Sequence, residues 1–159
     1  MKSFSYFLFV WAFAFQACSQ APKSTKAMDQ LPTSEAEWKA KLSEEEFYIL
    51  RQKGTERPYT GKFLMHVDKG YYTCKGCGTR LFKSDSKFDS HCGWPSFDEA
   101  IKGAVIYKKD LSFGMVRTEV MCAKCEGHLG HVFDDGPEET TGQRYCTNSV
   151  SIKFVPETE

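Results

Sequence analysis

The sequence predicts a mainly β domain, mostly antiparallel, that short helices precede. Three observations predict this fold class. Short runs rich in Val, Tyr, Phe and Thr recur after residue 60, as is typical of strands. Turn signals containing Gly, Asp and Pro separate those runs. No long helical patterns alternate with the runs, as a parallel α/β sheet would require.

Length and charge narrow the class of protein further. The chain has 159 residues, enough for one domain with a substantial hydrophobic core. Its 21 basic and 21 acidic residues give a formal net charge of zero. There is no basic excess to hold a nucleic-acid backbone, so we expect no nucleic-acid partner. No internal repeat is visible, and we expect a monomer.

The first 17 residues have the composition of a signal peptide. Lys2 provides a basic start, and residues 4–15 are almost wholly apolar. About 12 apolar residues suit the apolar region of a secretion signal, whereas a membrane-spanning helix needs about 20. A buried helix of the domain is the alternative, and the polar segment that follows at once argues against it.

Cys18 follows this leader directly. A small residue before a cysteine, here Ala17, resembles the lipidation signal of bacterial lipoproteins. We therefore expect residues 1–17 to be removed and a lipid on Cys18 to anchor the protein in a membrane. The protein would be exported to the bacterial cell envelope or periplasm. Simple secretion after cleavage behind Ala21 is the alternative. Residues 18–33 have no apolar period, which is typical of a flexible tether.

Two short helices are predicted at the start of a domain that spans residues 34–156. Residues 34–37 and 43–46 each form a capping-box pattern, a Ser followed three positions later by Glu. Apolar residues follow each box at helical spacing. Gly54 ends the second helix, and Pro58 confirms the break.

Six segments after the helices have the composition or the alternation of β-strands. They are residues 63–67, 71–73, 105–107, 116–120, 131–133 and 150–154. Turn signals lie between them at residues 68–70, 102–103, 110–114 and 134–137.

Two C-x-x-C pairs predict a structural zinc site. The pairs are Cys74 with Cys77 and Cys122 with Cys125. Two such turns complete a tetrahedral site of four cysteines, which leaves no open position for catalysis at the metal. One alternative is a disulfide framework, which export permits. Another is a redox C-x-x-C, but that motif belongs at the start of a helix in a βαβ unit, and none is predicted here.

Cys92 and Cys146 belong to neither pair. Cys92 lies in a loop rich in Gly and Pro, beside Trp94, whose indole can offer an apolar wall. Arg144 lies close to Cys146 in sequence, and a cationic neighbour raises the thiolate fraction of a cysteine. Taken singly, each of these cysteines is more often inert than catalytic.

Polar groups that can move protons lie near the second of these cysteines in sequence. His128 and His131 can supply protons near neutral pH, and Asn148 can donate hydrogen bonds. A lone histidine is more often an ordinary hydrogen-bonded residue. Two spare thiols, two histidines and a tryptophan in a loop together predict dithiol redox chemistry.

Four strings, together with both C-x-x-C pairs, resemble the methionine-R-sulfoxide reductases, the B-type methionine sulfoxide reductases. The strings are residues 51–61, 92–97, 128–137 and 144–149, and the resemblance covers residues 35–154. It implies a zinc-bearing antiparallel β domain of two small sheets, with one structural Zn²⁺ held by four cysteines. It also implies a peptide-methionine (R)-S-oxide reductase that repairs proteins after oxidative stress.

The resemblance assigns a role to each candidate residue. Cys146 is the nucleophile and Cys92 the recycling thiol. Trp94 packs against the S-methyl group of the substrate, and Phe133 forms a wall of the pocket. The residues that bind or protonate the sulfoxide oxygen are His128, His131 and Asn148, and the residue that tunes the nucleophile is Arg144. One departure from the family is His91, where glycine is usual.

The resemblance also implies the order of the reaction. Protonation of the sulfoxide oxygen, by His131 first and His128 next, opens the sulfur to attack by Cys146, which becomes a sulfenic acid. Cys92 condenses with it to a disulfide, which a thioredoxin-like donor reduces. Oxidised proteins and peptides are the expected substrates. The alternatives are a non-enzymatic zinc-ribbon interaction module and a thiol–disulfide oxidoreductase that acts on protein cysteines.

Overall fold

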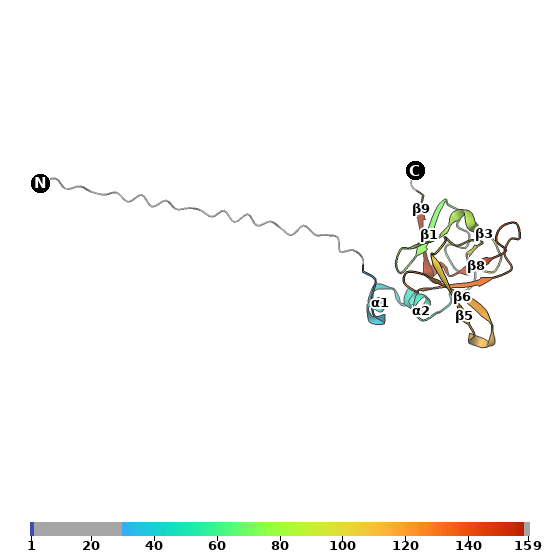
Figure 1. Cartoon of the computed structure of the whole chain (residues 1–159), viewed down its shortest axis with the longest axis horizontal. Coiled ribbons are helices and arrows are strands. Elements are labelled where there is room, and N and C mark those ends of the chain that lie inside the picture. The colour runs from blue at the N-terminus through green and yellow to red at the C-terminus, as the bar shows by residue number, and fades with distance from the viewer. Residues whose placement is uncertain (2–29, 158–159) are drawn as a thin grey trace. The chain divides into compact units, whose positions relative to one another are not determined.

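The computed structural model describes Met1 and residues 30–157 (Figure 1). Three predicted features lie outside these residues: the signal peptide except for Met1, the lipidation site at Cys18, and most of the tether. Among the residues that are described, no helix is long and apolar enough to cross a bilayer.

Both predicted helices are present, and both capping boxes are formed. Helix α1 spans Glu35–Lys41 and helix α2 spans Glu44–Leu50. Each begins after a serine whose hydroxyl accepts a hydrogen bond from the backbone of a glutamate three residues later. The glutamate carboxylate accepts one in return from the serine backbone. The two patterns satisfy four N–H groups that would otherwise lack a partner, which explains why such short helices begin where they do.

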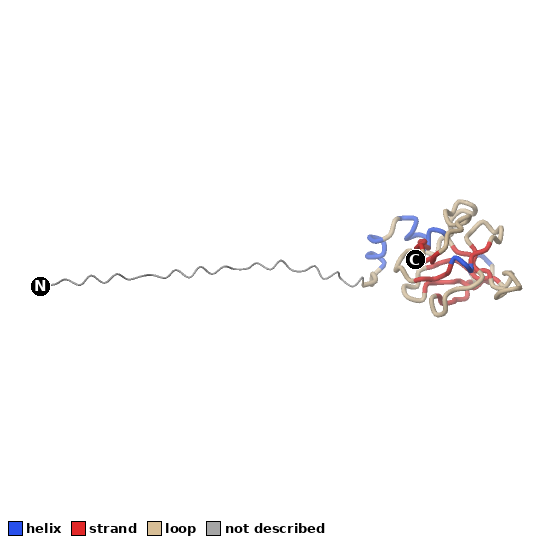
Figure 2. The backbone as a smooth tube through the Cα atoms, turned by 90° about the horizontal axis from the view of Figure 1, so that it is seen from above, coloured by secondary structure: helices blue, strands red, loops and turns tan. Residues whose placement is uncertain are grey.

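The helices pack on the second C-x-x-C turn. Trp38, Leu42 and Leu50 form a small apolar cluster that includes Cys125. The Arg51 guanidinium donates to the backbone oxygen of Cys125 over 3.0 Å. Figure 2 shows these helices to one side of the strands. The N-terminal helices therefore pack against the predicted zinc ligand Cys125.

The strands form two antiparallel sheets, which confirms the predicted fold class. One sheet has three strands in the order β2-β1-β9 and the other has six in the order β3-β4-β8-β7-β6-β5. The first sheet contains β1 (Gly70–Cys74), β2 (Arg80–Lys83) and β9 (Ile152–Pro156). The second contains β3 (Lys87–Phe88), β4 (Ser96–Phe97), β5 (Val105–Asp110), β6 (Arg117–Cys122), β7 (His128–Phe133) and β8 (Arg144–Thr147). Short 3₁₀ turns occupy Ser84–Ser86, Ser112–Gly114 and Ser149–Ser151.

The hydrophobic core joins the two sheets through aromatic rings. Phe82 on β2 stacks on Phe97 on β4, with ring centroids 4.3 Å apart. Tyr72 on β1 meets the same Phe97 edge-on at 4.9 Å. Such pairs contribute about 0.5–1.5 kcal/mol each beyond the area that they bury. This core fixes β4 and β8, the strands from which the candidate site is built.

One predicted strand is wrong, and the limits of the other five differ from those predicted. Residues 63–67 form turns: Phe63 is buried, but Met65 and Val67 are 74% and 84% exposed. Their apolar composition serves a single anchoring side chain, Phe63, and no strand within residues 30–157 pairs with this segment. The last strand begins at Ile152, since a 3₁₀ turn occupies the two residues where it was expected. The strand predicted from residue 131 already begins at His128.

Candidate active site and zinc centre

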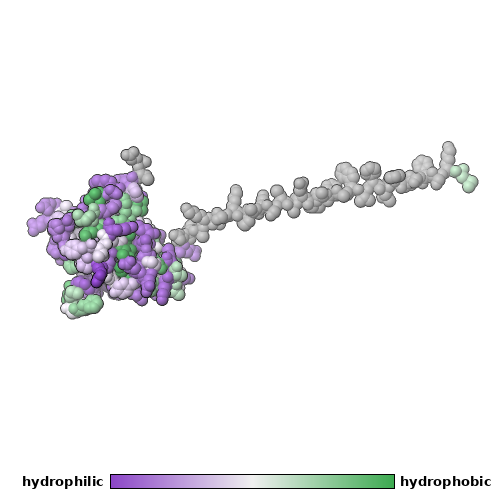
Figure 3. All heavy atoms as spheres, turned by 180° about the vertical axis from the view of Figure 1, so that it is seen from behind, coloured by the Kyte–Doolittle hydropathy of each residue, from purple (hydrophilic) through white to green (hydrophobic). Residues whose placement is uncertain are grey.

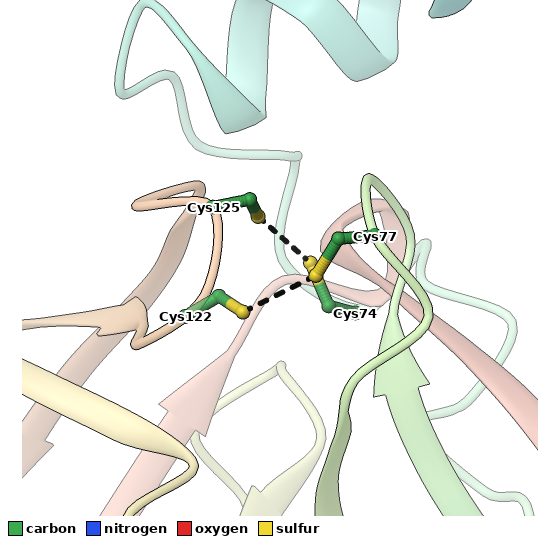
Figure 4. A group of neighbouring side chains, drawn as sticks. All are labelled: Cys74, Cys77, Cys122 and Cys125. Atoms are coloured by element: carbon green, nitrogen blue, oxygen red, sulfur yellow. Dashed lines mark hydrogen bonds between the residues drawn. The ribbon is translucent and has the colours of Figure 1, made fainter. Parts of the chain in front are cut away.

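The four cysteines of the two C-x-x-C pairs form one cluster (Figure 4). Their sulfurs all lie within 4.8 Å of one another. The closest contacts cross between the turns: Cys74 to Cys125 and Cys77 to Cys122, each 3.5 Å between sulfurs. The six cysteines that the structure describes are free thiols, so neither turn is a disulfide.

The two turns have the same backbone design. In each, the N–H four residues after the first cysteine donates to the carbonyl of that cysteine: Gly78 to Cys74 and Glu126 to Cys122. Both donors have a positive φ, 75° and 57°. Gly127, the next residue, has another task, because a Cβ there would lie 2.9 Å from a methyl carbon of Leu50. Glycine at this position lets α2 approach the cluster.

This geometry fits a structural Zn²⁺. A regular tetrahedron with Zn–S bonds of about 2.3 Å has S···S edges of about 3.8 Å. The observed separations match that size, and four thiolates fill the coordination shell. Lys75, inside the first C-x-x-C turn, forms an ion pair with Glu46 at 2.7 Å. None of the four cysteines lines the pocket described below, so the metal supports the scaffold.

A second group of predicted residues meets on one face of the six-stranded sheet. Cys146 on β8 lies directly opposite His131 on β7 and Ser96 on β4. Directly opposed residues of an antiparallel pair project on the same face, with Cβ atoms about 4.5–5.5 Å apart. The next row along this face holds Arg144 beside Phe133. Register therefore brings together residues that are distant in sequence.

Cys92 approaches this row from a loop. Its sulfur lies 3.5 Å from that of Cys146 and 3.4 Å from the Ser96 hydroxyl. The hydrogen bond from Cys146, and weaker bonds from Ser90 and Ser96, lower the pKa of Cys92 to about 4. The contact with Cys92 and burial raise the pKa of Cys146, against the opposing charge of Arg144. The titration of the two thiols is therefore coupled through the contact between their sulfurs.

Hydrogen bonds from Tyr59, in the segment 51–61, hold the loop that contains Cys92. The backbone N–H of Tyr59 donates to the Gly93 carbonyl over 2.7 Å, and its phenol donates to the His91 carbonyl over 3.0 Å. His91 has φ 55°, a left-handed conformation in which non-glycine residues are uncommon. The family's usual glycine at this position matches that conformation. His91 accordingly places mild backbone strain directly beside Cys92.

A pocket of about 110 Å³ opens where these elements meet. That volume is far below the roughly 300–1,000 Å³ of sites for drug-sized ligands, so it suits one side chain. Five of the predicted residues line it together with Thr55, Arg117 and Gly130; they are Trp94, His131, Phe133, Cys146 and Asn148. Arg144 lies beside it, with its guanidinium 4.5 Å from the Phe133 ring centre and bidentate on Asp135.

The two histidines have different surroundings. His131 contacts the pocket, and its Nε2 lies 2.8 Å from the Asp110 carboxylate. His128 is buried and pairs through Nδ1 with Glu119 at 2.8 Å, while its Nε2 has no hydrogen-bond partner within residues 30–157. Burial lowers the pKa of His128, against the opposing influence of Glu119. His128 does not line the pocket.

Glu56 is a supporting residue that the sequence analysis missed. Its carboxylate accepts hydrogen bonds from the backbone N–H groups of Ser149 and Val150, at 2.7 and 3.0 Å. Its own backbone N–H donates to the side-chain oxygen of Asn148, and its carbonyl accepts from the Trp94 indole. Asn148 also donates to the Leu129 carbonyl, which leaves one amide hydrogen for a ligand.

Asp110 and Glu119 were missed as well. Each is the carboxylate partner of a predicted histidine. Hydrogen bonds from Ser112, then from His131 and Arg117, hold the pKa of Asp110 far below its usual range. Burial acts to raise the pKa of Glu119, but bonds with Lys53 and His128 lower it overall. Both carboxylates lie on a different strand from their histidine. The sequence alone could not show either contact, because the pairing of the strands was not known.

The fold and the site together define a zinc-stabilised thiol enzyme with a two-cysteine centre. Comparison with known proteins identifies its family. Residues 42–156 match the model of the SelR domain. Proteins called peptide methionine sulfoxide reductase MsrB are similar over most of their length, as three examples show. Identity is 50% with that of Bradyrhizobium diazoefficiens, covering 84% of this chain and 96% of that protein. It is 52% with that of Methanosarcina mazei (82% and 94%) and 54% with that of Leptospira interrogans (78% and 95%).

The chain belongs to the MsrB family of peptide methionine sulfoxide reductases. This confirms the resemblance on which the site residues were predicted. Among solved structures, the Yippee-like domain of Mis18 gives a TM-score of 0.44 at 18% identity, over 58% of this chain and all of that one. A likeness at that level carries no argument about fold or function.

Proposed function

We propose that this protein reduces methionine-R-sulfoxide in peptides and proteins to methionine, with Cys146 as the nucleophile. One observation carries the proposal. Cys146 lines a pocket that fits one side chain, opposite His131, with a second sulfur 3.5 Å away. Membership of the MsrB family supports the same activity.

The first step forms one bond to oxygen and breaks another. His131 donates a proton to the sulfoxide oxygen, from the ring nitrogen that Asp110 does not engage. The Cys146 thiolate attacks the activated group, the oxygen passes to Cys146 as a sulfenic acid, and methionine leaves. The methionine sulfur gains the two electrons that Cys146 loses. Arg144, two residues away on the same strand, favours the thiolate by its charge.

The second step restores the nucleophile. The Cys92 thiol attacks the sulfenic acid, water leaves, and a Cys92–Cys146 disulfide forms. The sulfurs must approach by about 1.5 Å from their present separation to reach the disulfide length of about 2.05 Å. A thioredoxin-like dithiol then reduces the bond by exchange and is itself oxidised.

Substrate binding follows from the walls of the pocket. Trp94 and Phe133 offer apolar surface to the S-methyl group, and Asn148 offers its remaining amide hydrogen to the sulfoxide oxygen. His128 is buried and turned to Glu119, so we assign it a supporting role behind His131. A chiral sulfur held between an apolar wall and fixed donors can be accepted in one epimer only, as is typical of these reductases.

An assay with dabsyl-methionine-R-sulfoxide and dithiothreitol tests this function. Turnover of the R epimer, little turnover of the S epimer, and loss of activity in Cys146→Ser are expected. The close pair of sulfurs also suits a thiol–disulfide oxidoreductase that acts on protein cysteines. That activity would reduce insulin disulfides and leave the sulfoxide untouched. A zinc-ribbon interaction module would do neither.

For the segment before the domain we propose a signal peptide over residues 1–17 and a lipid anchor on Cys18. The basic start, the apolar run and the Ala17–Cys18 pair support it. The protein would then work in the cell envelope, and its reductant would be a thioredoxin-like protein outside the cytoplasm. Labelled palmitate should appear on the protein and vanish in Cys18→Ser. Palmitate that persists in the variant would contradict lipidation at Cys18.

A further inference from the structure

The hairpin between β5 and β6 exposes a group of large apolar side chains at its tip. Phe113 is 90% exposed, Val116 75%, Leu111 61% and Met115 44%. The hairpin extends from the body of the sheet (Figure 1), and Figure 3 shows hydrophobic atoms at its end. We name these four residues the apolar tip. A group of exposed apolar side chains is typical of a binding surface, whereas single exposed apolar side chains are ordinary.

The backbone of the apolar tip is strained at Phe113, whose ring points to solvent. Phe113 has φ 56° and ψ 26°, the left-handed region that bulky residues avoid. Gly114 follows with φ 70°, which glycine adopts freely. A strained residue that presents an uncovered ring to solvent is better explained by a ligand that covers the ring than by folding.

The apolar tip is continuous with the active site. Asp110, the last residue of β5, accepts hydrogen bonds from Arg117, the first residue of β6, and from the Ser112 backbone, and it lies 2.8 Å from His131. Arg117 itself lines the pocket. Met115 and Val116 precede it directly, so the tip begins at the rim of the pocket. The carboxylate that holds His131 also holds the base of the hairpin.

The occupant follows from the size of the pocket and rests on the proposed function. A pocket of about 110 Å³ takes the oxidised side chain, so the rest of a peptide substrate must run over the rim. We propose that the apolar tip binds apolar side chains that neighbour methionine-R-sulfoxide in the substrate chain. The enzyme then favours oxidised methionines within hydrophobic segments, such as those that a damaged protein exposes.

Steady-state kinetics with dithiothreitol on three substrates tests this proposal. The substrates are N-acetyl-methionine-R-sulfoxide, a peptide with Leu and Phe around the sulfoxide, and a matched peptide with Ser and Gly there. The variant is the double change Leu111→Ser with Phe113→Ser. The control is Met65→Ser with Val67→Ser, which removes two equally exposed apolar side chains from a loop that does not line the pocket.

Wild type should prefer the apolar peptide, and the tip variant should lose that preference. We expect its kcat/KM for the apolar peptide to fall about tenfold, through KM, as removal of one buried apolar contact predicts. Its kcat/KM for the other two substrates, and all values of the control, should stay within about twofold of wild type. An equal fall on all three substrates, or no fall on any, would overturn the proposal.

Two further outcomes are distinguishable. Wild type that fails to reduce all three substrates would refute the proposed function itself, whatever the tip does. Sedimentation that shows a wild-type dimer and a monomeric tip variant would assign the surface to a second copy of this chain, and would also overturn the proposal.

Discussion

Cys92 and Cys146 are 54 positions apart in the sequence, yet their sulfurs lie 3.5 Å apart. The Cys92 loop meets strand β8 because Ser96, four residues after Cys92, pairs directly with Cys146. This short β4–β8 ladder holds the two sulfurs close together. In the proposed reaction Cys146 performs the first step and Cys92 the second, so mutation of each cysteine tests one step.

Changing Cys92 to Ser should remove recycling and leave the first step intact. Dithiothreitol can reduce the Cys146 sulfenic acid directly, so turnover with this small thiol should persist. Turnover with a thioredoxin donor should fall by about two orders of magnitude or more, because no disulfide forms for exchange. Parallel assays with the two reductants measure the difference. Full thioredoxin-driven activity in Cys92→Ser would contradict the assigned role.

Removing one zinc ligand should unfold the domain. Cys122→Ser leaves three sulfurs, and structural zinc contributes apparent binding free energies of about 10–16 kcal/mol that are coupled to folding. We expect about one zinc per chain in wild type, and loss of both metal and cooperative thermal unfolding in the variant. Elemental analysis and circular dichroism check this. Cys92→Ser is the matched control, and a folded, metal-free Cys122→Ser would refute the prediction.

Glu56→Gln should lower stability and disturb the pocket. The carboxylate accepts from one buried and one partly buried backbone N–H, and the amide can satisfy only one of them while its NH₂ faces the other. An unsatisfied buried donor costs about 1–3 kcal/mol in the free energy of unfolding, which denaturant titration measures. Glu45→Gln, at an exposed position on α2, is the control. Equal stability of the two variants would show that Glu56 does not hold the Asn148 segment.

Buried His128 should make stability depend on pH. Its pKa is lower in the folded than in the unfolded state, where it is about 6.5. The unfolded state therefore binds its proton first, and the stability that neutral His128 contributes is lost as pH falls below about 6.5. His128→Gln should flatten this loss, whereas exposed His91→Gln should not. Urea titrations between pH 5 and 8, with zinc content measured in parallel, give the comparison.

Local signals predicted the parts of the fold that depend on neighbouring residues. The capping boxes at Ser34 and Ser43 fixed both helices, because each box satisfies backbone groups within four residues. Each C-x-x-C turn is local in the same way, and the cluster could be predicted because one metal ion requires the two turns to meet. Residues 63–67 misled, since the hydrophobicity of Phe63 serves one contact with the core. Strands of two residues, such as β4, are too short to show a period.

The candidate site depended on resemblance more than on pattern. Cys146, Cys92 and Trp94 were predicted because their strings resemble the family. The carboxylates behind them were missed because their partners depend on register or on long-range contact. Glu56 bonds to a residue 93 positions away, and Asp110 read as a turn residue until β5 and β7 brought it to His131.

The most direct test is a single turnover without any reductant. Reduced enzyme is mixed with excess methionine-R-sulfoxide peptide, and the methionine formed per chain is measured together with the Cys146 adduct that dimedone traps. Cys92→Ser should form about one methionine per chain and carry a trapped sulfenic acid on Cys146, whereas Cys146→Ser should form none. Methionine formed at the wild-type level by folded, zinc-loaded Cys146→Ser would contradict the account.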